Sequence, residues 1–261
     1  MMIWEQDSYR APISFLVGRN IREYDISKAN INILLYFGII DNERYNYLYN
    51  LPRMERQVQV GLMQKNPDIA SALSNGFREM RGLFCTQNNI AENEILAIKK
   101  DALYIIDKVP QYTKFKNVEF LCKNLYTSFY YIGGLELYYN SKYEILDVKG
   151  ISDNILRYHE NYMKDFLMYM FSLIEKRDYE SAISDLNSFR NDYLNLKLSP
   201  GYYREFDNRS LYCTKYKYDG LNSFIPGIVS DDRLKDLDIS FNNNILMEIH
   251  RILVMLINNK L

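Results

Sequence analysis

Two aspartates stand out in this chain because each lies in or beside an apolar segment. Asp25 lies between a short strand-like run and an apolar helical run, and Asp101 lies inside the apolar run of residues 94–106. An ionised carboxylate in such surroundings is costly unless it is paired, hydrogen-bonded or bound to a metal ion. Two carboxylates from separate segments could hold Mg²⁺ or Mn²⁺ for phosphoryl transfer. Alternatively, Asp25 could cap the helix that begins near Ser27.

The elements that would position these aspartates follow from hydrophobic periodicity and turn residues. The pattern predicts a strand at 20–25, helices at 27–38, 42–49, 51–64 and 67–84, and strands at 94–99, 102–107, 117–122, 125–131, 134–139 and 143–149. We expect the strand ending near Asp25 to lie antiparallel beside the hairpin of residues 94–107, because ladder pairing satisfies the backbone of such apolar runs.

The pattern becomes helical after Gly150. Apolar residues recur at three- and four-residue steps over 155–173, 179–193 and 246–256, with an irregular stretch at 198–240 that holds prolines and glycines. The sequence therefore predicts an α+β fold in two parts. Residues 1–150 form the part with the sheet, and residues 151–261 form a mainly helical part packed on it.

Composition limits the classes of function. The 261 residues are 48% hydrophobic and 25% charged, and the net charge of −1 confines any nucleic-acid site to a local patch. Three scattered cysteines and two histidines do not fit a zinc site, a disulfide framework or a histidine-based triad. The N-terminal residues do not resemble a signal peptide, and no apolar run is long enough to span a membrane. We expect a reduced, intracellular protein of the cytoplasm with no membrane partner.

Four segments, in order along the chain, resemble motifs of the family B DNA polymerases. Residues 25–34, Asp-Ile-Ser-Lys-Ala-Asn-Ile-Asn-Ile-Leu, resemble the first palm motif, Asp-x-x-Ser-Leu-Tyr-Pro-Ser-Ile-Ile. Residues 100–103, Lys-Asp-Ala-Leu, look like the later part of the third palm motif, Asp-Thr-Asp-Ser. Residues 123–126, Lys-Asn-Leu-Tyr, are similar to the Lys-x-x-Tyr sequence of a palm strand, and residues 147–151 look like the Lys-Gly stretch before the thumb.

The resemblance implies a palm-like antiparallel sheet with helices, followed by a mainly helical, thumb-like part. It also implies that Asp25 and Asp101 are the catalytic residues and ligate Mg²⁺ or Mn²⁺. Lys123, Tyr126 and Lys149 would then contact nucleic acid. The resemblance covers roughly residues 20–200 and includes no exonuclease domain, so it describes a reduced palm and thumb.

A helix between the two aspartates should present basic side chains to an incoming nucleoside triphosphate. Arg53 and Arg56 follow the first motif and are the predicted nucleotide-binding residues, although a solvated helix face would show the same pattern. Arg78 and Arg81 are also available, and their three-residue spacing places them on one helix face.

The chain departs from the family pattern at several positions. Lys99 occupies the place of the other aspartate of the third motif, and Asn30 occupies the place of a tyrosine that stacks below the nucleotide sugar. The helix motif Lys…Asn-Ser-x-Tyr-Gly is absent. A metal ion would lack a ligand unless another carboxylate substitutes, and Lys99 or Lys100 could instead form an ion pair with Asp25 that replaces the metal.

Basic and aromatic amino-acid residues alternate in residues 112–131. This pattern suits single-stranded nucleic acid, where bases stack on rings and lysines follow phosphates, but a strand with one wet face has the same pattern.

Three hypotheses for function follow. The first is a minimal metal-dependent nucleotidyltransferase of polymerase type. The second is a catalytically inactive, palm-derived module that binds nucleic acid or a replication-protein partner. The third is an interaction protein of unrelated fold, in which the two aspartates lie far apart.

Overall fold

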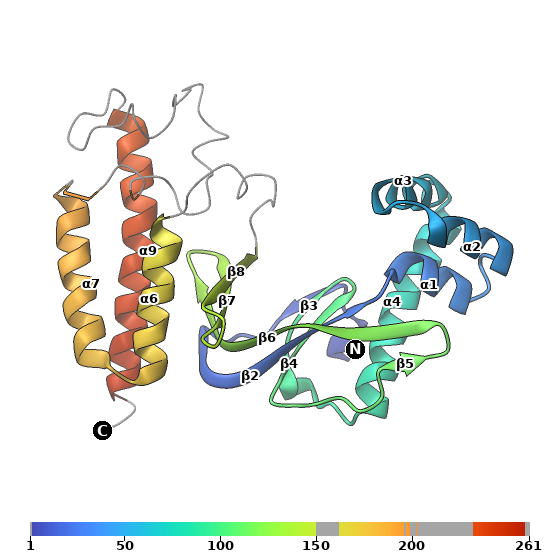
Figure 1. Ribbon diagram of the computed structural model, residues 1–261, viewed down its shortest axis with the longest axis horizontal. Helices are drawn as coiled ribbons and strands as arrows, with labels where there is room; N and C mark the ends of the chain where they lie inside the picture. The colour runs from blue at the N-terminus through green and yellow to red at the C-terminus, as the bar shows by residue number, and fades with distance from the viewer. Residues whose placement is uncertain (1, 150–161, 196, 199–201, 203–231, 259–261) are drawn as a thin grey trace. The chain divides into compact units, whose positions relative to one another are not determined.

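The computed structural model describes residues 2–149, 162–195, 197–198, 202 and 232–258 (Figure 1). Antiparallel strands alternate with helices in the first half of the chain, and helices predominate in the second half. The predicted α+β class is confirmed. The predicted segments 155–173 and 198–240 lie partly outside the described residues.

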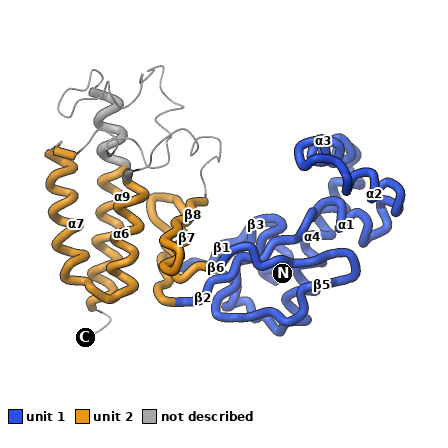
Figure 2. The backbone as a smooth tube through the Cα atoms, viewed as in Figure 1, with its two compact units in different colours: residues 1–13, 19–125 blue, residues 14–18, 126–261 orange. Residues whose placement is uncertain are grey.

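The chain divides into two compact units (Figure 2). Unit 1 comprises residues 1–13 and 19–125, and unit 2 comprises residues 14–18 and 126–261. The predicted boundary near residue 150 differs from this division. The reason is packing: strand residues between 130 and 148 share one apolar core with the helices that follow them.

The sheet of unit 1 brings together strands from both ends of its sequence. The strands lie side by side in the order β1 (Ser8–Arg10), β3 (Ile95–Lys99), β4 (Ala102–Ile106), β2 (Phe15–Ile26) and β6 (Val118–Ile132). The short β5 (Lys114–Phe115) pairs with β6. Strands β2 and β6 continue into unit 2. All five residues of β4 are buried, as expected for a continuous apolar run in the middle of a sheet. The predicted pairing of the strand that carries Asp25 with the hairpin of residues 94–107 is confirmed.

Four helices of unit 1 lie between β2 and β3 in the sequence. They are α1 (Ala29–Tyr36), α2 (Asn42–Asn50), α3 (Arg53–Met63) and α4 (Pro67–Gln87), all close to the predicted ranges. The core between the sheet and α1 and α4 contains stacked rings, such as Phe84 and Phe120 with centroids 4.2 Å apart. A short 3₁₀ turn, η1 (Ile3–Glu5), lies against α4.

Local signals in the sequence explain where these helices begin. The Asp41 carboxylate accepts a hydrogen bond of 2.8 Å from the Arg44 amide and caps α2. The Asn66 side chain accepts one of 2.9 Å from the Asp68 amide, and Pro67 occupies the first position of α4. Helix α1 instead begins after Lys28, and no side chain caps it. Asp25 therefore does not cap α1, so the alternative role considered for it is wrong.

Unit 2 combines strands with long helices. The second half of β6 pairs with β7 (Leu135–Asn140), which pairs with β8 (Ile145–Lys149). The helices are α6 (Tyr162–Lys176), α7 (Tyr179–Leu194) and α9 (Asp232–Asn258). Tyr130 and Phe171 stack with ring centroids 3.9 Å apart, joining β6 to α6 in the core.

Two predictions about elements are corrected. The strands predicted at 117–122 and 125–131 form one continuous strand, β6. Residues 232–240, predicted to be irregular, belong to α9, whose first residue is Asp232. Within the described part of the chain, no helix combines the length and apolarity that crossing a membrane requires.

Candidate functional site

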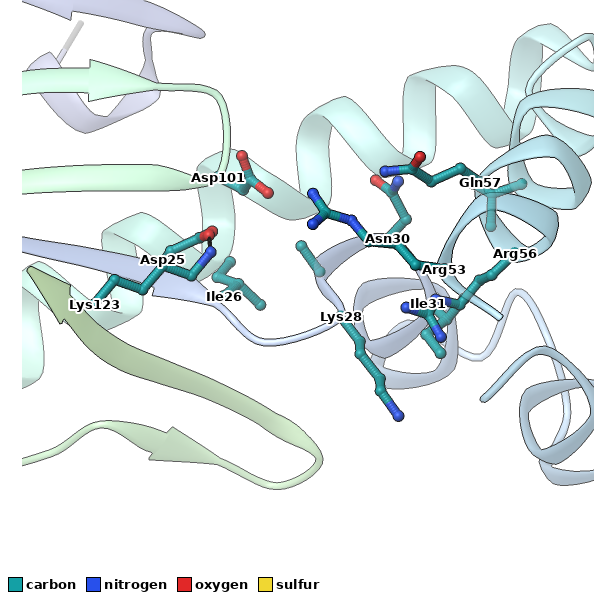
Figure 3. Close-up of a pocket in the computed structure, with 12 residues that line it drawn as sticks. Asp25, Ile26, Lys28, Asn30, Ile31, Arg53, Arg56, Gln57, Asp101 and Lys123 are labelled. Atoms are coloured by element: carbon teal, nitrogen blue, oxygen red, sulfur yellow. Dashed lines mark hydrogen bonds and ion pairs between the residues drawn. The ribbon is translucent and has the colours of Figure 1, made fainter. Parts of the chain in front are cut away.

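The pairing of β2 with β4 places the two predicted aspartates at one pocket of unit 1. Asp25 lies opposite Ala102 in the ladder, and Asp101 is the residue before Ala102, in the turn between β3 and β4. Both aspartates line a pocket of about 220 Å³ (Figure 3). Asp101 thus lies in a turn and not inside a strand, and both side chains are only partly buried. The third hypothesis, with the aspartates far apart, is not supported.

Basic and amide side chains from α1 and α3 also line this pocket. Arg53, Arg56 and Gln57 come from α3, and they fall on one helix face because their spacing is three and four residues. Asn30 comes from the start of α1. In Figure 3 the Arg53 side chain extends toward Asp101. Arg53 is exposed, whereas the Arg56 guanidinium donates a hydrogen bond of 3.1 Å to the Leu51 carbonyl.

The two carboxylate oxygens of Asp25 lie in different surroundings. Lys123 on β6 forms an ion pair with Oδ2. Oδ1 is buried, and no hydrogen-bond partner is found for it among the described residues. A buried carboxylate oxygen without a partner is costly, so Asp25 is well suited to receive a cation. The Lys123 side chain is 50% exposed and can therefore leave Asp25 without disturbing the core.

The ion pair between a lysine and Asp25 that the sequence suggested is formed by a different lysine, Lys123. The sequence suggested Lys99 or Lys100, but the Lys100 ammonium lies 5.5 Å from the centre of the Phe77 ring. Lys123 was predicted to contact nucleic acid, and the structure places it at the pocket beside Asp25. No sequence signal linked these two residues, because they are far apart in the chain and meet only through the sheet.

The strand that carries Asp25 holds a second carboxylate, that of Glu23. Glu23 precedes Asp25 by two residues and therefore shares its face of β2. Its carboxylate, however, accepts hydrogen bonds from the Tyr104 hydroxyl at 2.8 Å and the Asn124 amide at 2.6 Å. In the part of the chain that the structure describes, no three histidine, cysteine or acidic side chains are grouped to hold a metal ion. Asp25 and Asp101 would thus need water or substrate oxygens to complete a metal's coordination.

Arg78 and Arg81 of α4 do not reach the pocket, so the structure excludes them as the basic residues of this site. The Arg78 guanidinium donates to both oxygens of Asp7, at 3.0 and 2.7 Å. The fully buried Arg81 guanidinium donates to backbone carbonyls, including that of Trp4 at 3.1 Å. Sequence spacing places two arginines on one face of a helix but does not say which surface that face meets.

Tyr126 and Lys149 lie in unit 2 and are not part of the pocket, all of whose lining residues belong to unit 1. Both contact Asp147: the Tyr126 hydroxyl donates a hydrogen bond of 2.7 Å, and the Lys149 ammonium forms an ion pair at 2.7 Å. Tyr126 is 2% exposed and Tyr130 is completely buried. These rings cannot stack on bases as they lie, so the prediction that the rings in 112–131 form a stacking platform is wrong for them.

The ion pair between Asp7 and Arg78 predicts an acid-sensitive contribution to stability. The hydrogen bond from Arg78 holds the pKa of the Asp7 carboxyl below its ordinary value of 3.8. Because the pKa is depressed in the folded state, the stabilisation is present above pH 3.8 and is lost as the pH falls through the lowered pKa. We expect Asp7→Asn to flatten the pH dependence of the free energy of unfolding in this acid range, measured by urea denaturation. Identical acid profiles for the variant and the wild type would contradict this assignment.

Comparison with protein families places the chain in a known family of sequences. Residues 1–255 match the model of the family described as Bacteriophage PBS1 gene 130 protein. No curated protein matches the chain. Since the family match covers nearly the whole sequence, including every residue of the pocket, the chain belongs to the Bacteriophage PBS1 gene 130 protein family.

Proposed function

We propose that unit 1 carries a metal-dependent nucleotidyl-transfer site of polymerase type that acts on nucleic acid. The observation that carries the proposal is the lining of one pocket: Asp25 and Asp101 from the sheet, and Arg53 and Arg56 from α3. Carboxylates suit hard divalent cations, and guanidinium groups suit phosphate oxygens. A pocket with both kinds of group fits a nucleoside triphosphate bound together with a metal ion.

In this proposal the two aspartates bind the metal ion and the two arginines bind phosphate. Asp25 and Asp101 would hold Mg²⁺ or Mn²⁺, which when bound neutralises charge on the transferring phosphoryl group and orients the attacking oxygen. Arg53 and Arg56 would bind phosphate oxygens through the paired donors of each guanidinium. Phosphoryl transfer depends mainly on positioning and electrostatic stabilisation, so these four side chains supply the principal protein contribution.

The Lys123–Asp25 ion pair favours a second candidate function. If Lys123 stays on Asp25, its charge takes the place of the metal, and unit 1 is a binding module without catalysis. The same cations, Arg53 and Arg56, would then bind the phosphates of a nucleic acid. The two candidates differ in one respect, namely whether a divalent cation displaces Lys123 from Asp25.

Mn²⁺ titration of Lys123 variants distinguishes the two candidates. We expect Lys123→Met to bind Mn²⁺ about fivefold more tightly than the wild type, because a half-exposed ion pair contributes at most about 1 kcal/mol. Asp25→Asn should abolish binding in either background. Electron paramagnetic resonance of free Mn²⁺ measures the affinity directly, without any assay of activity.

A control variant and a contradicting outcome complete this test. Lys108→Met removes an ammonium that lies 3.7 Å from Glu94, and it should leave the Mn²⁺ affinity unchanged. Neither Lys108 nor Glu94 lines the pocket. If neither the wild type nor Lys123→Met binds Mn²⁺ at millimolar concentration, the metal site is refuted and the binding module remains.

A further inference from the structure

The turn that carries Asp101 has an unfavourable backbone conformation. Lys99 pairs with Ala102, so Lys100 and Asp101 form a two-residue turn between β3 and β4. Lys100 has a φ of 55°, in the left-handed region that costs a residue with a Cβ atom. Two-residue hairpin turns usually place glycine, asparagine or aspartate at such a position. Such strain persists only where the surroundings impose it.

Contacts from outside the hairpin hold Lys100 in this conformation. Its amide donates a hydrogen bond of 3.0 Å to the Asp7 carbonyl, and its carbonyl accepts a hydrogen bond from the Arg81 guanidinium. Its ammonium lies over the Phe77 ring. Arg81 and Phe77 both come from α4, and Asp7 lies just before β1. The turn is therefore fixed on both its amide side and its carbonyl side.

Arg81 is the central residue of this arrangement. Besides the Lys100 carbonyl, its guanidinium donates to the carbonyls of Trp4 at 3.1 Å and Gln6 at 2.6 Å. Burial lowers the pKa of Arg81 to about 10, so the group remains charged at neutral pH. The planar guanidinium group has five N–H donors in fixed directions and can donate to three carbonyls at once. The compact ammonium group of a lysine is less able to reach all three.

We infer that Arg81 is a positioning residue that holds the Lys100–Asp101 turn and thereby presents the Asp101 carboxylate to the pocket. Arg81 itself is not among the residues that line the pocket, and its hydrogen bonds go to the carbonyls of Trp4, Gln6 and Lys100. The role of the presented carboxylate as a metal ligand rests on the proposed function. The positioning of the turn rests only on the contacts of Arg81.

Two measurements on Arg81→Lys test the inference. Mn²⁺ affinity should fall about tenfold, the scale on which groups that orient a metal ligand act. Hydrogen exchange of a peptide covering residues 97–103 should accelerate, because the turn loses the donor to its carbonyl. Arg78→Lys is the matched control on the same helix. It retains a cation opposite Asp7 and should change neither quantity.

A second substitution separates positioning of the turn from a general loss of stability. Lys100→Gly in the Arg81→Lys background removes the penalty of the left-handed conformation and should restore most of the Mn²⁺ affinity and of the protection against exchange. Lys100→Ala removes the same side chain but keeps the penalty, so it should restore neither. Equal effects of the glycine and alanine variants would overturn the inference.

The inference remains testable in the wild-type chain and in the absence of metal binding. The amide of Lys100, which donates to the Asp7 carbonyl, should exchange far more slowly than those of the Gly133–Gly134 turn, which also joins two strands through two residues. Equal rates would overturn the inference even if Arg81→Lys does not fold. A wild type that binds no Mn²⁺ refutes the proposed function, while the exchange measurements still decide whether Arg81 holds the turn.

Discussion

Replacing either Asp25 or Asp101 by asparagine should strongly reduce metal-dependent nucleotide incorporation and leave the fold intact. Each substitution removes one of the two carboxylates that line the pocket, and with it the charge that would hold Mg²⁺ or Mn²⁺. We expect a loss of about 10²-fold or more, the scale for removing one electrostatic group from a transfer site. Incorporation of labelled nucleotides on a primed template, with each metal in turn, measures the effect.

Asp41→Asn is the matched control for these two variants. Asp41 caps α2 and does not line the pocket, and asparagine is an equally good cap. This variant should therefore retain both activity and thermal stability. If the wild type incorporates no nucleotide with either metal on any primed template, the enzymatic proposal is contradicted and the binding module is favoured. If Asp25→Asn remains active, Asp25 is not a metal ligand of the reaction.

The juxtaposition of Asp25 and Asp101 was predictable because it depends on local patterns. Apolar strand-like runs on either side of Lys100 predicted a hairpin, and the run before Asp25 predicted a neighbouring strand. Antiparallel pairing of these strands brings Asp25 and Asp101 together because the register sets Asp25 opposite Ala102. The left-handed conformation of Lys100 was not predictable, because a lysine carries no signal for it. That conformation is imposed by Arg81 and Asp7 from other parts of the chain.

Which face of an element meets the site was not predictable from periodicity. Arg53 with Arg56 and Arg78 with Arg81 show the same spacing, yet the first pair lines the pocket and the second binds Asp7 and backbone carbonyls. Spacing fixes which side chains share a face, and tertiary packing decides where that face points. Gln57 of the pocket was missed, although it follows Arg53 by four residues and so shares its face.

The aromatic and basic residues of β6 illustrate the same ambiguity in a strand. Alternation predicted one face with rings and one with lysines, and both a nucleic-acid platform and a half-buried strand fit this pattern. In the structure the rings of Phe120 and Tyr130 enter the cores of units 1 and 2, respectively. Burying these rings stabilises the folded state through the hydrophobic effect. Rings on a solvent-exposed platform would not contribute this stabilisation.

Gly76→Ala should destabilise unit 1 by about 1–3 kcal/mol, the usual cost of forcing an extra methyl group into a packed core. Gly76 lies on α4 where α1 packs closely against it. A Cβ atom there would overlap Cγ2 of Ile33 and lie 3.0 Å from a ring atom of Phe37. Helix α1 would have to move, and because Asn30 of α1 lines the pocket, the displacement should also weaken ligand binding.

Gly61→Ala makes this prediction specific to packing. Gly61 lies inside α3, where a Cβ atom would meet no other atom within 4 Å. The same substitution there should raise the free energy of unfolding by about 0.5–1 kcal/mol, because alanine favours a helix over glycine. Trp4, the single tryptophan, lies in unit 1, so its fluorescence during urea denaturation reports the unfolding of that unit. Opposite shifts of the two midpoints are expected. A stabilising effect of both variants would contradict the close approach of α1 to α4 at Gly76.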